Sequence, residues 1–359
     1  MEDEFELSVF DTGNQAVAVA FARYGFDTAI ERLSDLELKE LSDFHFRLSQ
    51  TAGGREPKRP TASELEKFGR DLFALVVRGG IKTIYDRLPQ SHIRLQIYSN
   101  RPDIQSIPWE YIQEPNCVPG PNAFRSVVRV VPTIGVPAPV ARKLDETVRM
   151  LFVYAEPPRE ASVDWPIIKS SIESQFSKRL PENFKLDVLD AATTDSFRKA
   201  FAGKKYDILH MVCHGEIAPN GTGNLLFQDV KGKTKEPISA VKLGNFLKDK
   251  QLRLVVLSAC NTAAGDFAKE FAVVAKTLVE CGIPSVVANQ FEIQNSAAAS
   301  FAEGFYSKLL ESGDVDLATT QGRVDLHFGA AAMPGGSASI DWGIPTLYRH
   351  LGGAKAFKS

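Results

Sequence analysis

Two short apolar runs, rich in β-branched residues, constrain the fold of this chain most. Residues 206–213 lead into His214, and residues 253–259 lead into Cys260. Runs of this length that end at glycine or polar residues are typical of buried strands in a parallel sheet. Between them, Ser239 precedes apolar residues at helical spacing, which predicts a capped helix. A strand–helix–strand unit joins parallel strands whose carboxyl ends share one edge, so we expect His214 and Cys260 at neighbouring strand tips.

A histidine and a cysteine at that edge are the side chains of a thiol nucleophile with its base. Open α/β sheets bind their ligands along this edge, and Gly215 would let a substrate backbone approach closely. Taken singly, a strand cysteine is most often a core residue, and a lone histidine is usually structural or solvated. Because both residues stand where a strand ends, the joint pattern favours a catalytic pair.

The motifs Cys-His-Gly at 213–215 and Leu-Ser-Ala-Cys-Asn-Thr at 257–262 resemble the signatures of the CHAT family, caspase-like cysteine peptidases of the clan of caspases and separase. The resemblance covers nearly the whole chain, because further segments match in order: 107–110, 282–291, 305–310 and 341–345. It implies an α/β fold, with a caspase-like, mostly parallel sheet that has helices on both faces. A smaller, non-catalytic α+β front part would precede it. By analogy with caspase-like enzymes, the backbone N–H groups of Gly215 and Cys260 would form the oxyanion hole.

The chain is expected to divide into two parts joined by a linker. Its 359 residues suit about two domains of ordinary size. Residues 135–147 begin with a proline-rich segment, which is typical of a boundary or an extended crossing. By resemblance, residues 1–134 are the non-catalytic, pseudo-caspase-like part of the CHAT module. Residues 148–359 repeat strand and helix, as expected for the catalytic caspase-like domain.

Local signals predict where several elements begin. The turn sequence Asp-Thr-Gly-Asn at 11–14 separates two apolar runs and predicts a hairpin over residues 5–21. Ser63 and Glu66 have the spacing of a capping box, and Thr194 is the expected cap of a later helix.

Two polar segments, 216–224 and 330–340, are rich in glycine, proline and asparagine and are expected to be mobile loops. Residues 342–348 are expected to close the fold as a final strand or edge piece. Since mobile loops near a site must be ordered before it works, we expect the isolated chain to be weakly active or inactive.

The pocket for the substrate side chain before the scissile bond has five acidic candidates, each more often a solvated charge. Asp266 is the first choice, because it follows Cys260 in the loop over the sheet edge. The others are Asp229, Glu292, Asp207 and Glu216. The sequence offers no arginine cluster near His214 or Cys260, which disfavours a caspase-like preference for aspartate.

Cys213 and His210 are expected to be structural. Alternate strand residues point to opposite faces, so Cys213 should face away from the edge site, and His210 should be buried. A metal site built from His210, His214 and Cys260 lacks an apparent fourth ligand. We therefore expect neither a metal nor a cofactor.

Composition gives no support to nucleic acid or a membrane as a partner. The chain is 44% hydrophobic and 24% charged with a net charge of −2, so nothing favours nucleic acid or an acidic membrane surface. No apolar run reaches the roughly 18 residues that a membrane helix needs. The sequence shows no signal peptide and no CxxC pair, which predicts free thiols in the cytoplasm, although a Cys213–Cys281 disulfide stays open. The four cysteines are Cys117, Cys213, Cys260 and Cys281.

We expect a cysteine endopeptidase that cleaves a protein or peptide substrate with a Cys260–His214 dyad and is activated by a protein partner or ligand. The resemblance implies a role in bacterial defence or regulated proteolysis. Two alternatives stay open. One is a catalytically silent CHAT-fold interaction module, and the other is an acyl-transfer hydrolase that uses the same dyad on a small molecule.

Overall fold

A computed structural model describes most of the chain. The described residues are 5–13, 15–22, 27–49, 60–87, 93–99, 101–115, 125–133, 140–144, 146–158, 164–258, 267–290, 293, 295–331, 341–351 and 353–358.

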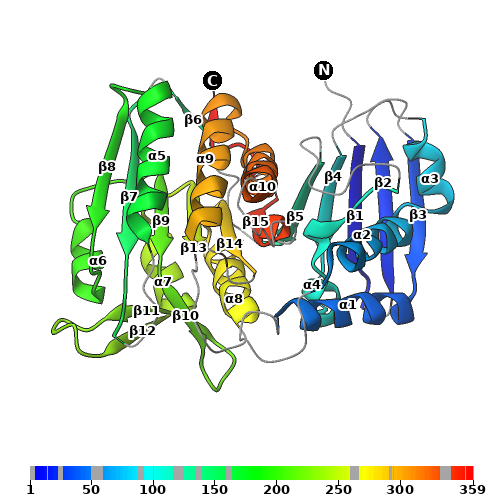
Figure 1. Ribbon diagram of the computed structural model, residues 1–359, viewed down its shortest axis with the longest axis horizontal. Coiled ribbons are helices and arrows are strands. Elements are labelled where there is room, and N and C mark those ends of the chain that lie inside the picture. The colour runs from blue at the N-terminus through cyan, green and yellow to red at the C-terminus, as the bar shows by residue number, and fades with distance from the viewer. Residues whose placement is uncertain are drawn as a thin grey trace.

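The structure is built on one 11-stranded sheet that runs through both halves of the chain (Figure 1). Its strands, in order across the sheet, are β3 (Asp27–Leu33), β2 (Ala16–Ala22), β1 (Phe5–Asp11), β4 (Ile93–Tyr98), β5 (Arg125–Val131), β15 (Pro345–His350), β14 (Ser285–Asn289), β13 (Leu254–Ser258), β9 (Ile208–Val212), β7 (Val148–Tyr154) and β8 (Phe184–Leu189). Neighbouring strands are parallel except in the β3–β2–β1 meander and between β15 and β14. The expected mostly parallel α/β sheet is therefore confirmed.

Helices cover both faces of the sheet in the second half of the chain and one face in the first half (Figure 1). In chain order they are α1 (Asp35–Ser49), α2 (Ala62–Val76), α3 (Gly79–Tyr85), α4 (Pro102–Ser106), α5 (Trp165–Arg179), α6 (Thr194–Ala200), α7 (Ala240–Leu247), α8 (Phe267–Glu280), α9 (Asn295–Ser312) and α10 (Val315–Ala331), with 3₁₀ turns η2 (Trp109–Tyr111) and η3 (Asp341–Gly343).

Two hydrophobic cores lie on the two sides of the sheet. One core lies under α5, α9 and α10 and continues into the front part, where it takes in side chains of β1, β2 and α2. The other lies under α6, α7 and α8, with Leu257 and Leu278 fully buried in it. Strand residues alternate between the two, since Ile208 and Val212 belong to the first core and Leu209 and Met211 to the second. This alternation decides which way each side chain near the sheet edge points.

The predicted hairpin is confirmed, but two predicted helix caps are wrong by one or two residues. β1 and β2 pair in an antiparallel register that begins with Asp11 opposite Ala16. The capping box of α2 is formed by Thr61 and Glu64, not by Ser63 and Glu66, because the helix begins two residues earlier than the apolar spacing indicates. Thr193, rather than Thr194, caps α6 in the same way, since its hydroxyl accepts the backbone N–H of Ser196 at 3.1 Å.

The last strand lies in the middle of the sheet, so its expected edge position is wrong. β15 pairs parallel with β5 and antiparallel with β14, and all six of its residues are buried. It begins with Pro345, where a missing N–H costs the ladder little. β15 therefore joins the sheet of the front part to that of the second half.

A second, three-stranded sheet replaces the loop expected over residues 216–224. Its strands are β10 (His214–Ile217), β11 (Gly223–Gln228) and β12 (Lys235–Ser239), all antiparallel. β10 and β11 are joined by a tight turn in which Ala218 N–H donates to Thr222 O at 2.9 Å. Of the other segment expected to be mobile, residues 332–340 lie outside the described residues.

The described part of the linker contributes a strand of its own. β6 (Arg142–Lys143) pairs in parallel with β16 (Phe357–Lys358) near the end of the chain. The division into residues 1–134, 135–147 and 148–359 stays a prediction.

Candidate active site

The site is organised by two neighbouring parallel strands, β9 and β13. Their register ends with Val212 opposite Ser258. The N–H of Cys213 donates to the Ser258 carbonyl oxygen at 3.3 Å, so the pairing continues one residue past β9. The two strands therefore reach the carboxyl edge of the sheet together, which is the edge where α/β sheets bind ligands.

His214 follows directly at this edge, in a different element from the one expected. It is the first residue of β10 rather than the tip of β9, because the chain leaves the large sheet after Cys213 and pairs with β11. His214 lies opposite Leu226 in that pairing, whereas its neighbour Gly215 lies opposite Leu225, which belongs to the core under α7 and α8. Alternation along the strand thus turns His214 away from that core, and its residue exposure is only 2%.

Cys260 follows two residues after the end of β13 and lies outside the described residues, as do Asp266 and Glu292. The contact between His214 and Cys260, the oxyanion hole at Gly215 and Cys260, and the pocket role of these two acids stay predictions.

His210 has no role as a base at neutral pH. Its Nδ1 is 2.8 Å from the Tyr306 hydroxyl and its Nε2 is 3.3 Å from Ser258 Oγ, so both ring nitrogens have protein partners. Burial lowers the pKa of the ring to about 3. The expectation that His210 is buried is confirmed.

Cys213 lies in the core under α7 and α8, with 1% of its surface exposed. Its side chain thus faces away from the side of the sheet that His210 faces, as the alternation predicts. No disulfide joins Cys213 to Cys281 in the structure.

Three acidic candidates for the substrate pocket are described, and each carboxylate has partners within the fold. The Asp229 carboxylate closes the turn between β11 and β12, and the backbone N–H groups of Thr234 and Lys233 hold its pKa below the usual value. Glu216, on β10, forms an ion pair with Lys235 at 2.8 Å.

Asp207 is excluded from a pocket at the carboxyl edge. It precedes β9 at the opposite edge of the sheet, where its buried carboxylate accepts hydrogen bonds from Arg142 at 2.7 Å and from the Arg149 N–H at 2.9 Å. Its place in the sequence, three residues before His210, gave no sign of this, because Asp207 precedes the strand at its opposite end.

A buried polar cluster beside β14 was not recognised as a unit from the sequence. The Glu110 carboxylate accepts hydrogen bonds from Arg129 at 3.1 Å and from the Gln290 side chain at 3.0 Å. Gln290 follows β14, the strand next to β13, and also donates to Gly343 O at 2.6 Å. The polar partners of Glu110 come from 19 and 180 residues away, a pairing that no local pattern reveals.

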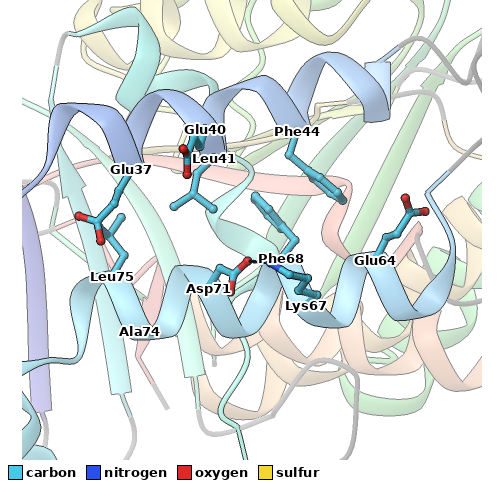
Figure 2. A pocket seen from close by; sticks show the side chains of 10 residues that line it. All are labelled: Glu37, Glu40, Leu41, Phe44, Glu64, Lys67, Phe68, Asp71, Ala74 and Leu75. Carbon is cyan, nitrogen blue, oxygen red and sulfur yellow. Dashed lines mark hydrogen bonds and ion pairs between the residues drawn. The ribbon is translucent and has the colours of Figure 1, made fainter.

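A groove lies elsewhere, between α1 and α2 in the front part (Figure 2). Its volume is about 660 Å³, and Phe44 and Phe68 stack across its floor. Glu37, Glu40 and Asp71 line its rim, and none of the predicted site residues contributes to it. The described residues hold no cluster of three potential metal ligands and no helix long and apolar enough to cross a bilayer.

The fold and the position of His214 at the sheet edge define a caspase-like α/β protein. The model of the CHAT domain family matches residues 84–336, which is 253 of the 359 residues, and the chain belongs to that family. No curated protein sequence matches the chain.

Several solved cysteine-peptidase structures are similar in fold. The Arg-specific cysteine proteinase gingipain R (RgpB) of Porphyromonas gingivalis is 12% identical with a TM-score of 0.50, over 89% of this chain and 75% of that one. Separase of Saccharomyces cerevisiae in complex with securin is 10% identical with a TM-score of 0.45, over 97% of this chain. The matched region is only 30% of the separase chain. Pro-Sf-caspase-1 is 13% identical with a TM-score of 0.35, over 57% of this chain and 92% of that one.

Proposed function

We propose that the protein is a cysteine endopeptidase in which Cys260 is the nucleophile and His214 is the base. The observation that carries the proposal is the pairing of β9 with β13, which brings Cys213 and Ser258 into hydrogen-bond contact at the carboxyl edge. His214 follows the first of these residues directly. Cys260 follows the second after one intervening residue, a distance of at most about 7 Å along the chain.

The proposed reaction divides the work between these groups. His214 removes the proton from the Cys260 thiol, whose ordinary pKa near 8.5 keeps it mostly protonated at neutral pH. The thiolate attacks the peptide carbonyl carbon, and backbone N–H groups of Gly215 and Cys260 donate to the oxyanion. The imidazolium then gives its proton to the leaving amine, which leaves an acyl-enzyme. Water, deprotonated by His214, attacks the thioester, and collapse of the second tetrahedral intermediate returns the thiol and releases the carboxylic acid.

The substrate in this proposal is a protein or peptide chain, and Asp266, Glu292 and Asp229 are the candidate pocket residues. Residues 1–134 would be non-catalytic, and a protein partner or ligand would activate the enzyme. The non-catalytic front part rests on membership of the CHAT family, the pocket residues on their places in the sequence, and the activation on the polar loops. The same membership suggests a role in bacterial defence or regulated proteolysis.

Labelling by an electrophilic peptide probe tests the proposal. We expect an acyloxymethyl ketone peptide to add once to the wild-type chain, as measured by intact mass, and not to Cys260→Ala. Cys213→Ala is the matched control, since it removes a buried thiol 47 residues away in the sequence and should be labelled like the wild type. Labelling of Cys260→Ala to the same extent as a labelled wild type would reject Cys260 as the nucleophile. Faster turnover of small esters than of peptides would favour a small-molecule hydrolase.

A further inference from the structure

Three buried polar side chains connect α9 to the end of β13. The Tyr306 hydroxyl on α9 is 2.8 Å from His210 Nδ1, and His210 Nε2 is 3.3 Å from Ser258 Oγ. Their residue exposures are 0%, 1% and 7%, in the same order. We call Tyr306, His210 and Ser258 the relay, because each contacts the next through one hydrogen bond.

The relay runs diagonally toward the sheet edge. The register partner of His210 on β13 is Val256, yet its ring contacts Ser258, the last residue of that strand. The Phe152 ring on β7 stacks on the imidazole with centroids 5.3 Å apart and planes 17° apart, which fixes the ring from its other side. Three elements therefore hold the position of Ser258, two residues before the proposed nucleophile.

The relay is suited to hold its side chains in place rather than to donate a proton. Burial lowers the pKa of His210 to about 3 and raises that of Tyr306, so both groups are neutral at ordinary pH. A neutral imidazole can accept from Tyr306 and donate to Ser258, or the reverse, and either arrangement satisfies both of its nitrogens.

Stability alone gives little reason for these polar groups in the core. The surrounding side chains are apolar, including Ile208, Val256 and Phe305. A buried polar group costs free energy unless it is hydrogen-bonded, and the net gain of each bond is only about 1 kcal/mol. What a satisfied polar network adds over apolar packing is a fixed placement of its members, because hydrogen bonds of either direction require the same short distances between the same atoms.

We propose that His210 is a positioning residue, which fixes Ser258 against β9 and α9 and so sets the place from which Cys260 meets His214. The inference rests on the proposed function, because it takes Cys260 as the nucleophile. It predicts that loosening the relay slows the chemical step without weakening substrate binding, since the relay lies beneath the sheet edge and contacts no substrate.

Two nearly isosteric variants test the relay. Ser258→Ala and Tyr306→Phe each remove one hydroxyl and keep the packing. We expect each to lower the maximal rate of Cys260 modification by the peptide probe about 10-fold, with the probe concentration at half-maximal rate unchanged. The double variant should be little slower than the slower single variant, because both break one chain of bonds. His210→Gln, which keeps one hydrogen-bonding group at this position, should lose less than His210→Leu.

Tyr206→Phe is the matched control. Its hydroxyl also donates within the fold, to Asp187 at 2.6 Å, but it lies before β9 at the opposite edge of the sheet. Melting temperatures of all variants show what each hydroxyl contributes to stability. If Tyr206→Phe slows modification as much as Tyr306→Phe at equal loss of melting temperature, the relay is only structural.

The inference and the proposed function fail in different ways. Modification that persists in Cys260→Ala rejects the proposed function. Modification that requires Cys260 but proceeds at the wild-type rate in Ser258→Ala and Tyr306→Phe rejects the positioning role and leaves the proposed function intact.

Discussion

Removing the Glu110 side chain should destabilise the protein more than removing any exposed carboxylate. Glu110 is buried, and its carboxylate is 3.1 Å from the guanidinium of Arg129, which is also buried. Burial by itself lowers the pKa of Arg129. The negative charge of Glu110 is the largest of the effects that raise it, and together these bring the pKa above its usual value. Glu110→Ala would leave this cation without a counter-charge and the Gln290 side chain with one acceptor fewer.

The expected magnitude follows from the type of pair. Breaking a buried ion pair by removing one partner costs about 3–5 kcal/mol. Unfolding entropy of about 2.1 cal/mol/K per residue gives about 0.75 kcal/mol/K for 359 residues. For unfolding in one cooperative transition, the melting temperature should therefore fall by about 4–7 °C.

Differential scanning calorimetry of four variants measures this effect. Glu110→Gln keeps an acceptor but loses the charge, so its melting temperature should lie between those of wild type and Glu110→Ala. Glu110→Met combined with Arg129→Met should recover much of the loss, because neither charge is then buried alone. Glu173→Ala breaks a half-exposed i,i+4 pair with Lys169 and should cost under about 1 °C. A Glu110→Ala melting temperature within about 1 °C of wild type would refute the reasoning, since the buried charge would then have cost nothing.

Four further predictions follow from the same structure. Peptide cleavage by the activated protein should fall at least ~10³-fold in Cys260→Ser and by a similar factor in His214→Ala, and the double variant should be little worse, because the pair acts as a unit. Cys213→Ser should stay within about a few-fold of wild type in the same assay, since its side chain faces the opposite core; loss of cleavage here but not in Cys260→Ser would overturn the site. Unfolded His210 takes up a proton near pH 6.5 and the folded ring only near pH 3, so its contribution to stability is complete above pH 6.5 and falls on acidification by up to about 5 kcal/mol. In urea unfolding, the free energy of unfolding should therefore fall less steeply below pH 6.5 in His210→Gln than in wild type. The same steepness in both proteins would contradict the low pKa. Thr61→Ala should lower the free energy of unfolding in urea by about 1 kcal/mol, because it removes the cap of α2, and Ser63→Ala should lower it less. The reverse order would favour the cap position predicted from the sequence.

The sequence determined most elements of the second half of the chain, because their signals are local. The apolar runs before Cys213 and up to Ser258 became β9 and β13, and Ser239 caps α7 by accepting the Lys242 N–H, as expected. Parallel pairing of the two strands also followed, since a helix crosses between them. The exposed strand β12 was missed, because Pro237 and its charged neighbours hide the strand pattern on the edge of a small sheet.

Only the tertiary structure decided which distant residues meet. Nothing local in residues 345–350 distinguishes an edge strand from the central strand that β15 is, because that depends on its pairing with β5 and β14. Tyr306 contacts His210 across a separation of 96 residues, and Ser258 contacts His210 across a separation of 48 residues. The periodicity of the sequence determines which face of a helix or strand is apolar. Which residues of other elements that face contacts depends on the register and packing of the whole sheet, which is a non-local property of the folded chain.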